Sequence, residues 1–146
     1  MTHANMMNNY FNPNSVYTKE DFRHCFRIGR HVFERLLHDV HQVNPYFRQK
    51  LDRADRLGFS PHQKVTIALR MIAYASLADS IDDTYGMPES TCLDTLAEFR
   101  DTIVQLYKEE YLCEPNDQED LDWLICKAEY RGFPSMIGSL DYMHWQ

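Results

Sequence analysis

The sequence predicts a mainly α-helical protein, a bundle of about five or six helices followed by one strand-like segment. Apolar residues recur at helical spacing along most of the chain. Helix-start signals, such as the Ser60–Pro61 pair, precede these periodic stretches. The period changes after Gly132, where "SMIGSLDYM" is too short and too interrupted by glycine for a helix. With 146 residues, 44% of them hydrophobic, the chain can form one globular domain.

The chain divides into three expected parts. Residues 1–16 contain five asparagines and show no apolar period, so we expect a disordered arm there. Residues 17–131 carry the helical periodicity and form the expected helical domain. Residues 132–146 form the strand-like end, which lacks strand partners within the helical part and is expected to pack on it or to be disordered.

Cap signals place the first two helices. Thr18 is the expected N-cap of the first helix, and Asp21 three positions later completes a capping-box pattern. A second helix is expected from Arg30 to about Val43, with an apolar stripe along one side. The "NP" pair that follows ends it, because the residue before proline disfavours helical geometry.

The next helix is predicted to be the central one of the bundle. Ser60 is a favourable N-cap, and the helix is expected over residues 61–76. Its apolar residues fall on two sides, which is typical of a helix covered on both. One side carries Val65, Ala68, Leu69 and Ile72, and the other carries Ile67, Met71 and Tyr74.

A helix-turn-helix-like segment is predicted after the central helix. A short helix in "LADSIDDTY" and a turn at "GMP" precede a helix capped near Ser90, whose groove-reading positions would begin with Ser90 and Thr91. Its apolar face is expected to comprise Leu93, Leu96, Ala97, Ile103, Val104 and Tyr107. On the opposite face lie Asp94, Glu98 and Asp101, and carboxylates facing DNA phosphates would weaken binding. The last helix is expected to have Asn116 as its N-cap and to end before Gly132.

The charges of the two halves have opposite signs. Residues 1–70 carry 11 Lys and Arg against 6 Asp and Glu, and residues 71–146 carry 4 against 16. The basic residues either contact DNA phosphates, form an ordinary solvated face, or pair with the acidic half. The candidates for phosphate contact are Lys19, Arg23, Arg27 and Arg30 on one face of the first helix, and Arg48, Lys50, Arg53 and Arg56 in the connector after the second.

Composition excludes several protein classes. The four cysteines form no C-x-x-C pair, so we expect buried free thiols, with neither a zinc site nor a disulfide framework. The N-terminus lacks a signal-peptide pattern, and the longest apolar stretch is interrupted by Arg70 and is too short to cross a bilayer. We therefore expect no membrane contact, and a nuclear or cytoplasmic location.

Four segments together resemble the N-terminal part of PIF/Harbinger-type DDE transposases and of the nucleases derived from them. They are "RLGFSPHQK", "ALRMIAYAS", "PEST" and "RGFPSMIGSLDYMHW", and they occur in the order found in that family. The resemblance extends from about Tyr10 to Trp145. It implies that Asp141 is the first acid of a DDE triad and a ligand of Mg²⁺, on the first strand of an RNase H-like fold.

The resemblance also implies a limit on activity. Two-metal phosphodiester cleavage requires several rigidly placed oxygen ligands, and Asp141 is one of three acids in the family triad. We therefore expect a transposase fragment, with an incomplete RNase H-like part, that is inactive as this chain. The alternative is a non-catalytic helical module that binds DNA or a protein partner.

Overall fold

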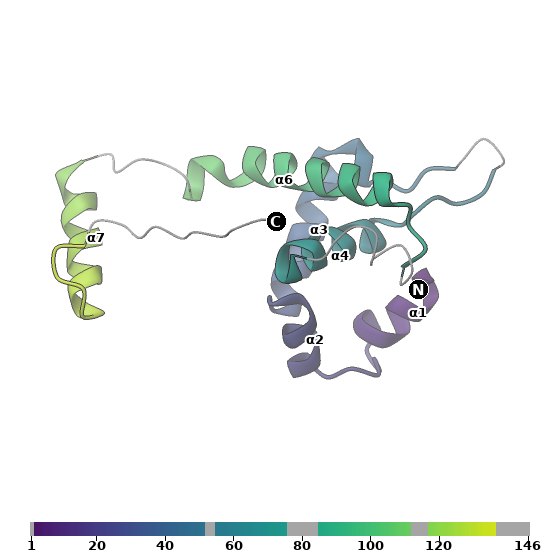
Figure 1. The fold of residues 1–146 in the computed structure, drawn as a ribbon, viewed down its shortest axis with the longest axis horizontal. Coiled ribbons are helices and arrows are strands. Elements are labelled where there is room, and N and C mark those ends of the chain that lie inside the picture. Colours follow the sequence, from purple (N-terminus) through teal and green to yellow (C-terminus); the bar gives the residue numbers. More distant parts are fainter. Residues whose placement is uncertain (1, 52–54, 76–84, 112–116, 137–146) are drawn as a thin grey trace. The chain divides into compact units, whose positions relative to one another are not determined.

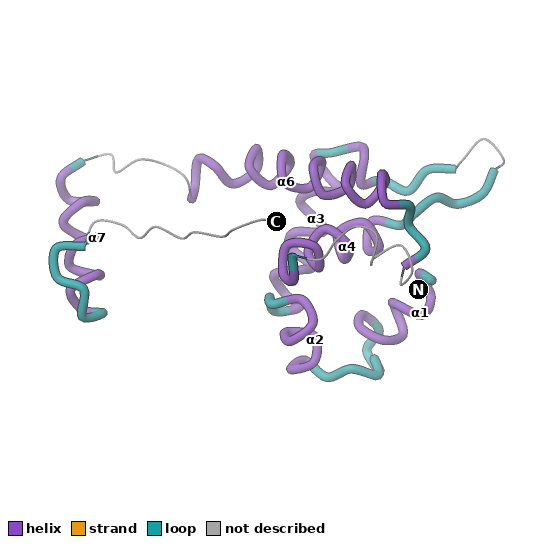
Figure 2. Tube along the Cα trace, in the orientation of Figure 1, coloured by secondary structure: helices purple, strands orange, loops and turns teal. Residues whose placement is uncertain are grey.

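The computed structural model describes residues 2–51, 55–75, 85–111 and 117–136. The chain forms two compact units, Met1–Leu106 and Tyr107–Gln146. Figure 2 shows helices and loops, with no strand, in these described ranges, which confirms a mainly α-helical protein. The α-helices are α1 (His3–Met6), α2 (Lys19–Phe26), α3 (Arg30–Val43), α4 (Pro61–Tyr74), α6 (Glu89–Tyr111) and α7 (Gln118–Tyr130). A π-helix η1 (Met7–Phe11) and a 3₁₀ helix η2 (Pro45–Phe47) complete the elements.

Two capping boxes start helices where the sequence predicts them. Before α2, the Asp21 backbone N–H donates to Thr18 Oγ1 at 3.2 Å, and the Thr18 N–H donates to Asp21 Oδ2 at 2.9 Å. The hydrogen bonds that the Asp21 carboxylate accepts from the Thr18 backbone N–H and hydroxyl group lower the pKa of this carboxyl group. Ser60 and Gln63 form the same reciprocal pair before α4. Each box satisfies two backbone donors that a helix end otherwise leaves unpaired.

Helix α4 is the central element, as predicted, with buried residues on two sides. Val65, Ala68 and Leu69 belong to a large cluster that includes Phe26 and Phe33. Ile67 and Met71 belong to a second cluster with Tyr85, Met87 and Cys92. In the first unit α1, α2 and α3 all pack against α4 (Figure 1). Ile72 departs from the prediction, because 56% of it is exposed.

The predicted disordered arm is wrong for residues 3–11. These residues form α1 and η1, and they bury Met6, Tyr10 and Phe11 in the large cluster. The Phe11 ring lies 4.9 Å from Phe33 and 5.2 Å from His62, centroid to centroid. Nine residues are too few to display a helical period, whereas three large apolar side chains stabilise the packed state substantially.

Helix α6 begins at Glu89, and its buried face overlaps the predicted one only in part, since Leu96 and Ile103 pack against the large cluster. The buried residues are Cys92, Thr95, Phe99 and Thr102, whereas Leu93 and Val104 are 49% and 45% exposed. The threonines are buried because their hydroxyl groups have partners. Thr95 Oγ1 lies 2.8 Å from the Tyr46 hydroxyl, and Thr102 Oγ1 donates to the Glu98 carbonyl at 2.6 Å.

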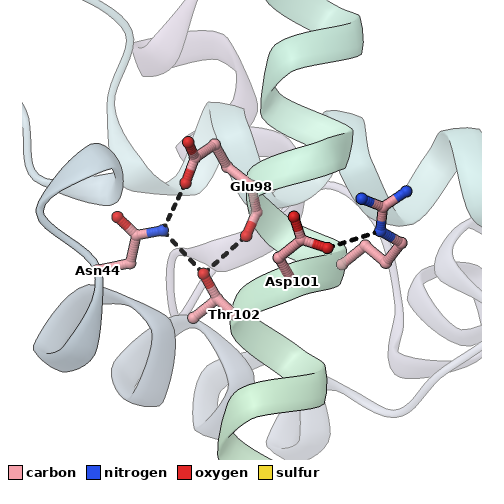
Figure 3. Close-up of polar contacts among 5 residues, drawn as sticks. Asn44, Glu98, Asp101 and Thr102 are labelled. Atoms are coloured by element: carbon pink, nitrogen blue, oxygen red, sulfur yellow. Dashed lines mark hydrogen bonds and ion pairs between the residues drawn. The ribbon is translucent and has the colours of Figure 1, made fainter.

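Asn44 joins the end of α3 to α6 (Figure 3). Its side-chain amide donates to Glu98 Oε2 and to Thr102 Oγ1, each at 2.8 Å. Its side-chain oxygen accepts from the Tyr46 N–H at 2.8 Å, which starts η2. One side chain therefore fixes the exit from α3 and the position of α6 against it.

Helix α7 begins one residue later than predicted and ends as predicted. Asp117 is the N-cap and accepts from the Asp120 N–H at 2.9 Å. Gly132 has a φ of +85°, and the Phe133 N–H donates to the Ala128 carbonyl, which is the Schellman arrangement. The predicted strand lies mostly at 137–146 and the short helix of the helix-turn-helix at 77–85, so both fall largely outside the described residues.

The docked N-terminal segment predicts a large stability effect at Phe11. We expect Phe11→Ala to lower the free energy of unfolding by about 3 kcal/mol, because it empties a buried site between aromatic rings. Val16→Ala is the matched control at a residue that is 73% exposed, with an expected change below about 0.5 kcal/mol. Urea unfolding followed by circular dichroism measures both values. Equal stability of the two variants would contradict the docked segment.

The Asn44 junction predicts a second, polar effect. Asn44→Ala removes three hydrogen bonds and is expected to lower the free energy of unfolding by about 1–2 kcal/mol. Arg100→Ala is the control, because its pair with Asp101 is exposed and should leave the free energy of unfolding unchanged. Thermal and urea unfolding test both variants, and an unchanged Asn44→Ala variant would contradict the bridging role.

Candidate nucleic-acid interface

Three of the predicted basic residues lie together on α2. Lys19 and Arg23 are exposed and one turn apart, and Arg27 is the exposed C-cap residue at the end of the helix. Of the acids in the first turn, Asp21 is engaged with Thr18. The three cations therefore share a solvent-facing edge, where they can approach a phosphate backbone.

Arg30 does not continue this row, which corrects the prediction of one basic face. It is the first residue of α3, and its guanidinium Nε lies 2.9 Å from Glu34 Oε1. Its Nη2 group donates to the Phe11 carbonyl. Arg30 thus ties the N-terminal segment to α3 and is occupied by structural contacts.

The connector residues after α3 have different environments. Arg48 donates to the carbonyls of His41 at 3.4 Å and Gln42 at 3.1 Å, so it caps the C-terminal end of α3. Lys50 and Arg56 are both exposed, on either side of a chain reversal closed by a hydrogen bond from the Gly58 N–H to the Lys50 carbonyl. Arg53 lies outside the described residues.

The described part of α6 does not provide the features of a groove-reading helix. Ser90 is exposed and Thr91 is half-buried in the first turn, which contains Glu89 and no cation. Two acids of the predicted stripe, Glu98 and Asp101, have protein partners. Glu98 accepts from Asn44, and Asp101 accepts from Arg100 at 2.8 Å (Figure 3).

The structure also brings together two residues that the sequence prediction missed. Arg70 and Tyr74 lie one turn apart near the end of α4, and Tyr74 is 39% exposed. The guanidinium carbons of Arg27 and Arg70 lie 5.3 Å and 5.5 Å from the centre of the Tyr74 ring. Arg70 is the one cation within "VTIALRMIAYASLA", and that isolated charge is the signal that could have identified it.

Another cation of α4 is partly buried and is engaged in contacts within the fold. Lys64 Nζ donates to the Tyr46 carbonyl at 2.6 Å and lies 4.2 Å from the centre of the Tyr46 ring. Burial lowers the pKa of this ammonium group. Lys64 therefore joins η2 to α4 and does not contribute to a phosphate-binding surface.

Metal ligation finds no support in the described ranges. No three His, Cys, Asp or Glu side chains there form a group that could hold a metal ion. Asp141, the predicted catalytic acid and ligand of Mg²⁺, lies outside them. The expectation of buried cysteines is correct for Cys92 and wrong for Cys126, which is exposed. No helix of the described segments is long and apolar enough to cross a membrane.

Two protein-family models match parts of this chain. Residues 3–41, which contain α1, η1, α2 and most of α3, match a domain of unknown function, DUF8418. Residues 109–146, which contain α7 and Asp141, match the plant transposon protein family. No curated protein and no solved structure matches the chain significantly. The match at residues 109–146 supports a transposase-related origin of the chain.

Proposed function

We propose that this chain is the DNA-contacting N-terminal part of a Harbinger-type DDE transposase or of a nuclease derived from one. The observation that carries the proposal is the match of residues 109–146 to the plant transposon protein family, because it covers the "GSLDYMHW" segment of the resemblance. The exposed cations of α2 supply the chemistry for phosphate contact. Such a protein acts on double-stranded DNA and resides in the nucleus or the cytoplasm.

The DNA contact in this proposal is made by the backbone phosphates. Lys19, Arg23 and Arg27 are exposed on α2, and Lys50 and Arg56 are exposed in the connector. These side chains would contact phosphates and not the edges of the bases. They would therefore position the domain on a duplex without sequence preference. Arg30 and Arg48 support the surface through their structural contacts.

Asp141 has a role in catalysis only within a complete set of acids. Asp141 matches the first acid of the triad that holds Mg²⁺ in the PIF/Harbinger-type transposases that this sequence resembles. A lone carboxylate does not fit a pair of divalent ions, which need several oxygen ligands at fixed positions. The described residues add no cluster of ligands. We therefore assign the 146-residue chain no cleavage step of its own.

A second candidate function is a protein-interaction module that retains a transposase scaffold. Helix α7 has no buried residue, and Trp123 and Tyr130 are 58% and 93% exposed. Exposed aromatic side chains on a helix are typical of surfaces that bind other proteins. The two candidates differ in their response to DNA and salt.

Phosphate contact predicts salt-dependent binding of duplex DNA. Each contact contributes about −0.9 to the slope of log affinity against log salt, so these five exposed cations contribute about −4.5 at most. We expect Lys19→Gln/Arg23→Gln to reduce the magnitude of that slope by about 2. Fluorescence anisotropy with a labelled 20-base-pair duplex measures it.

The double variant Lys108→Gln/Lys127→Gln is the matched control. It removes the same number of positive charges from exposed positions outside α2 and the connector, and we expect the slope to stay unchanged. Undetectable binding of the wild-type chain at low salt would exclude the DNA function and favour the interaction module.

The assignment of no cleavage step predicts an inactive chain. We expect the purified protein to leave supercoiled plasmid intact at about 10 mM Mg²⁺ or Mn²⁺, because one acid cannot position two metal ions. Gel electrophoresis of the plasmid is the measurement, with Asp141→Ala as the control for trace contaminants. Metal-dependent nicking that disappears in Asp141→Ala would contradict the proposal.

A further inference from the structure

We propose that Arg27, Arg70 and Tyr74 form a preorganised site for a DNA backbone phosphate at the junction of α2 and α4. This inference rests on the DNA contact proposed above and deepens it by naming a site that includes two residues of α4. The two guanidinium groups lie 5.3 Å and 5.5 Å from one tyrosine ring, although they come from positions 43 residues apart in the sequence.

The tyrosine holds the junction together. The Tyr74 hydroxyl donates to the His24 carbonyl at 2.9 Å, which links the last turn of α4 to the last turn of α2. Its ring then offers an aromatic surface to both guanidinium groups, and such cation–π contacts stabilise a charged group without neutralising it. Tyr74 is therefore a positioning residue for the two arginines.

Arg70 forms a side-chain hydrogen bond with Tyr85, and the other donors of its guanidinium group can still bind an anion. Arg70 also lies over the ring of Tyr85, at 5.9 Å from its centre. Neither Arg27 nor Arg70 forms an ion pair with a carboxylate of the described segments, in contrast to Arg30 and Arg35. Two guanidinium groups beside one ring supply the positive charge and the planar donors that phosphodiester oxygens accept.

The backbone at Arg27 points to the same role. Arg27 has a left-handed conformation with a φ of 58°, at a helix end where glycine is usual. A non-glycine residue in this conformation is disfavoured. The Arg27 side chain lies over the Tyr74 ring, a contact that glycine at this position could not make.

The site is tested by duplex binding of single variants over a range of salt concentrations. Arg27→Gly and Arg70→Gln are each expected to reduce the magnitude of the salt slope by about 0.9 and the affinity at 0.1 M salt by about tenfold. Arg70→Lys keeps the charge and should keep the slope. Arg35→Gln is the matched control, because that side chain is paired with Asp39 on α3 and should leave the slope unchanged.

Thermal unfolding separates phosphate binding from a structural role. Arg27→Gly relieves the left-handed strain, so its Tm should equal or exceed that of the wild type while DNA binding weakens. Tyr74→Leu should weaken DNA binding several-fold, about three- to tenfold, because it releases both guanidinium groups. A fall in Tm with an unchanged salt slope in both arginine variants would overturn the site.

The outcomes distinguish this inference from the proposed function. If the wild type binds duplex DNA and both arginine variants keep its slope, the phosphate site is wrong and the DNA function stands. If the wild type does not bind DNA, the phosphate site and the proposed DNA function are both wrong. A separate experiment is calorimetric titration with inorganic phosphate. If Arg70→Gln abolishes millimolar phosphate binding and leaves the salt slope of DNA binding unchanged, the site binds free phosphate, and its contact with DNA is wrong.

Discussion

The burial of α4 on two sides is the constraint on which the rest of the first unit depends. One side of α4 buries Val65, Ala68 and Leu69 in the large cluster. Another side buries Ile67 and Met71 in the second cluster. The N-terminal segment, α2 and α3 pack against the first of these sides. Residues from Tyr85 onward, among them Met87 and Cys92, pack against the second. A helix enclosed in this way can carry charge only at its margins, since an unpaired charge in a core is strongly destabilising.

The charged residues at those margins show how aromatic rings stabilise cations here. Lys64 and Arg70 both extend from α4 over a tyrosine ring. Lys64 also donates to a carbonyl, so its ammonium group is committed to the fold. Arg70 contacts two rings and no described carboxylate, so its charge is held in position and still available. Of these two cations of α4, Lys64 stabilises the fold, and Arg70 is the one to which we assign the proposed phosphate contact.

The features that the sequence predicted correctly depend on local interactions. Thr18 and Ser60 start their helices through bonds to residues three positions away, so a short motif is enough to identify them. The bounds of α3 and the Gly132 end of α7 follow from similarly local rules. Fold class and the two-sided α4 could therefore be predicted from spacing alone.

The features that were missed depend on contacts distant in sequence. The docking of Phe11 and the burial of Thr95 and Thr102 are decided by partners on other elements. The roles of the basic residues were missed for the same reason. Arg30 and Arg48 looked equivalent to Arg23 in the sequence, and only the position of the Phe11 and Gln42 carbonyls distinguishes them.

For the proposed DNA contact, the distribution of charge favours the α2–α4 junction over α6. The first turn of α6 contains Glu89 and no cation, so a phosphate approaching it would meet repulsion beside the favourable helix N-terminus. The junction has the opposite arrangement. The C-terminal ends of α2 and α4 carry partial negative charge, which stabilises Arg27 and Arg70 in the free protein but repels a phosphate, so the attraction at the junction comes from the two guanidinium groups. Because the helix ends and the Tyr74 ring already hold both guanidinium groups, binding a phosphate requires little further ordering of side chains.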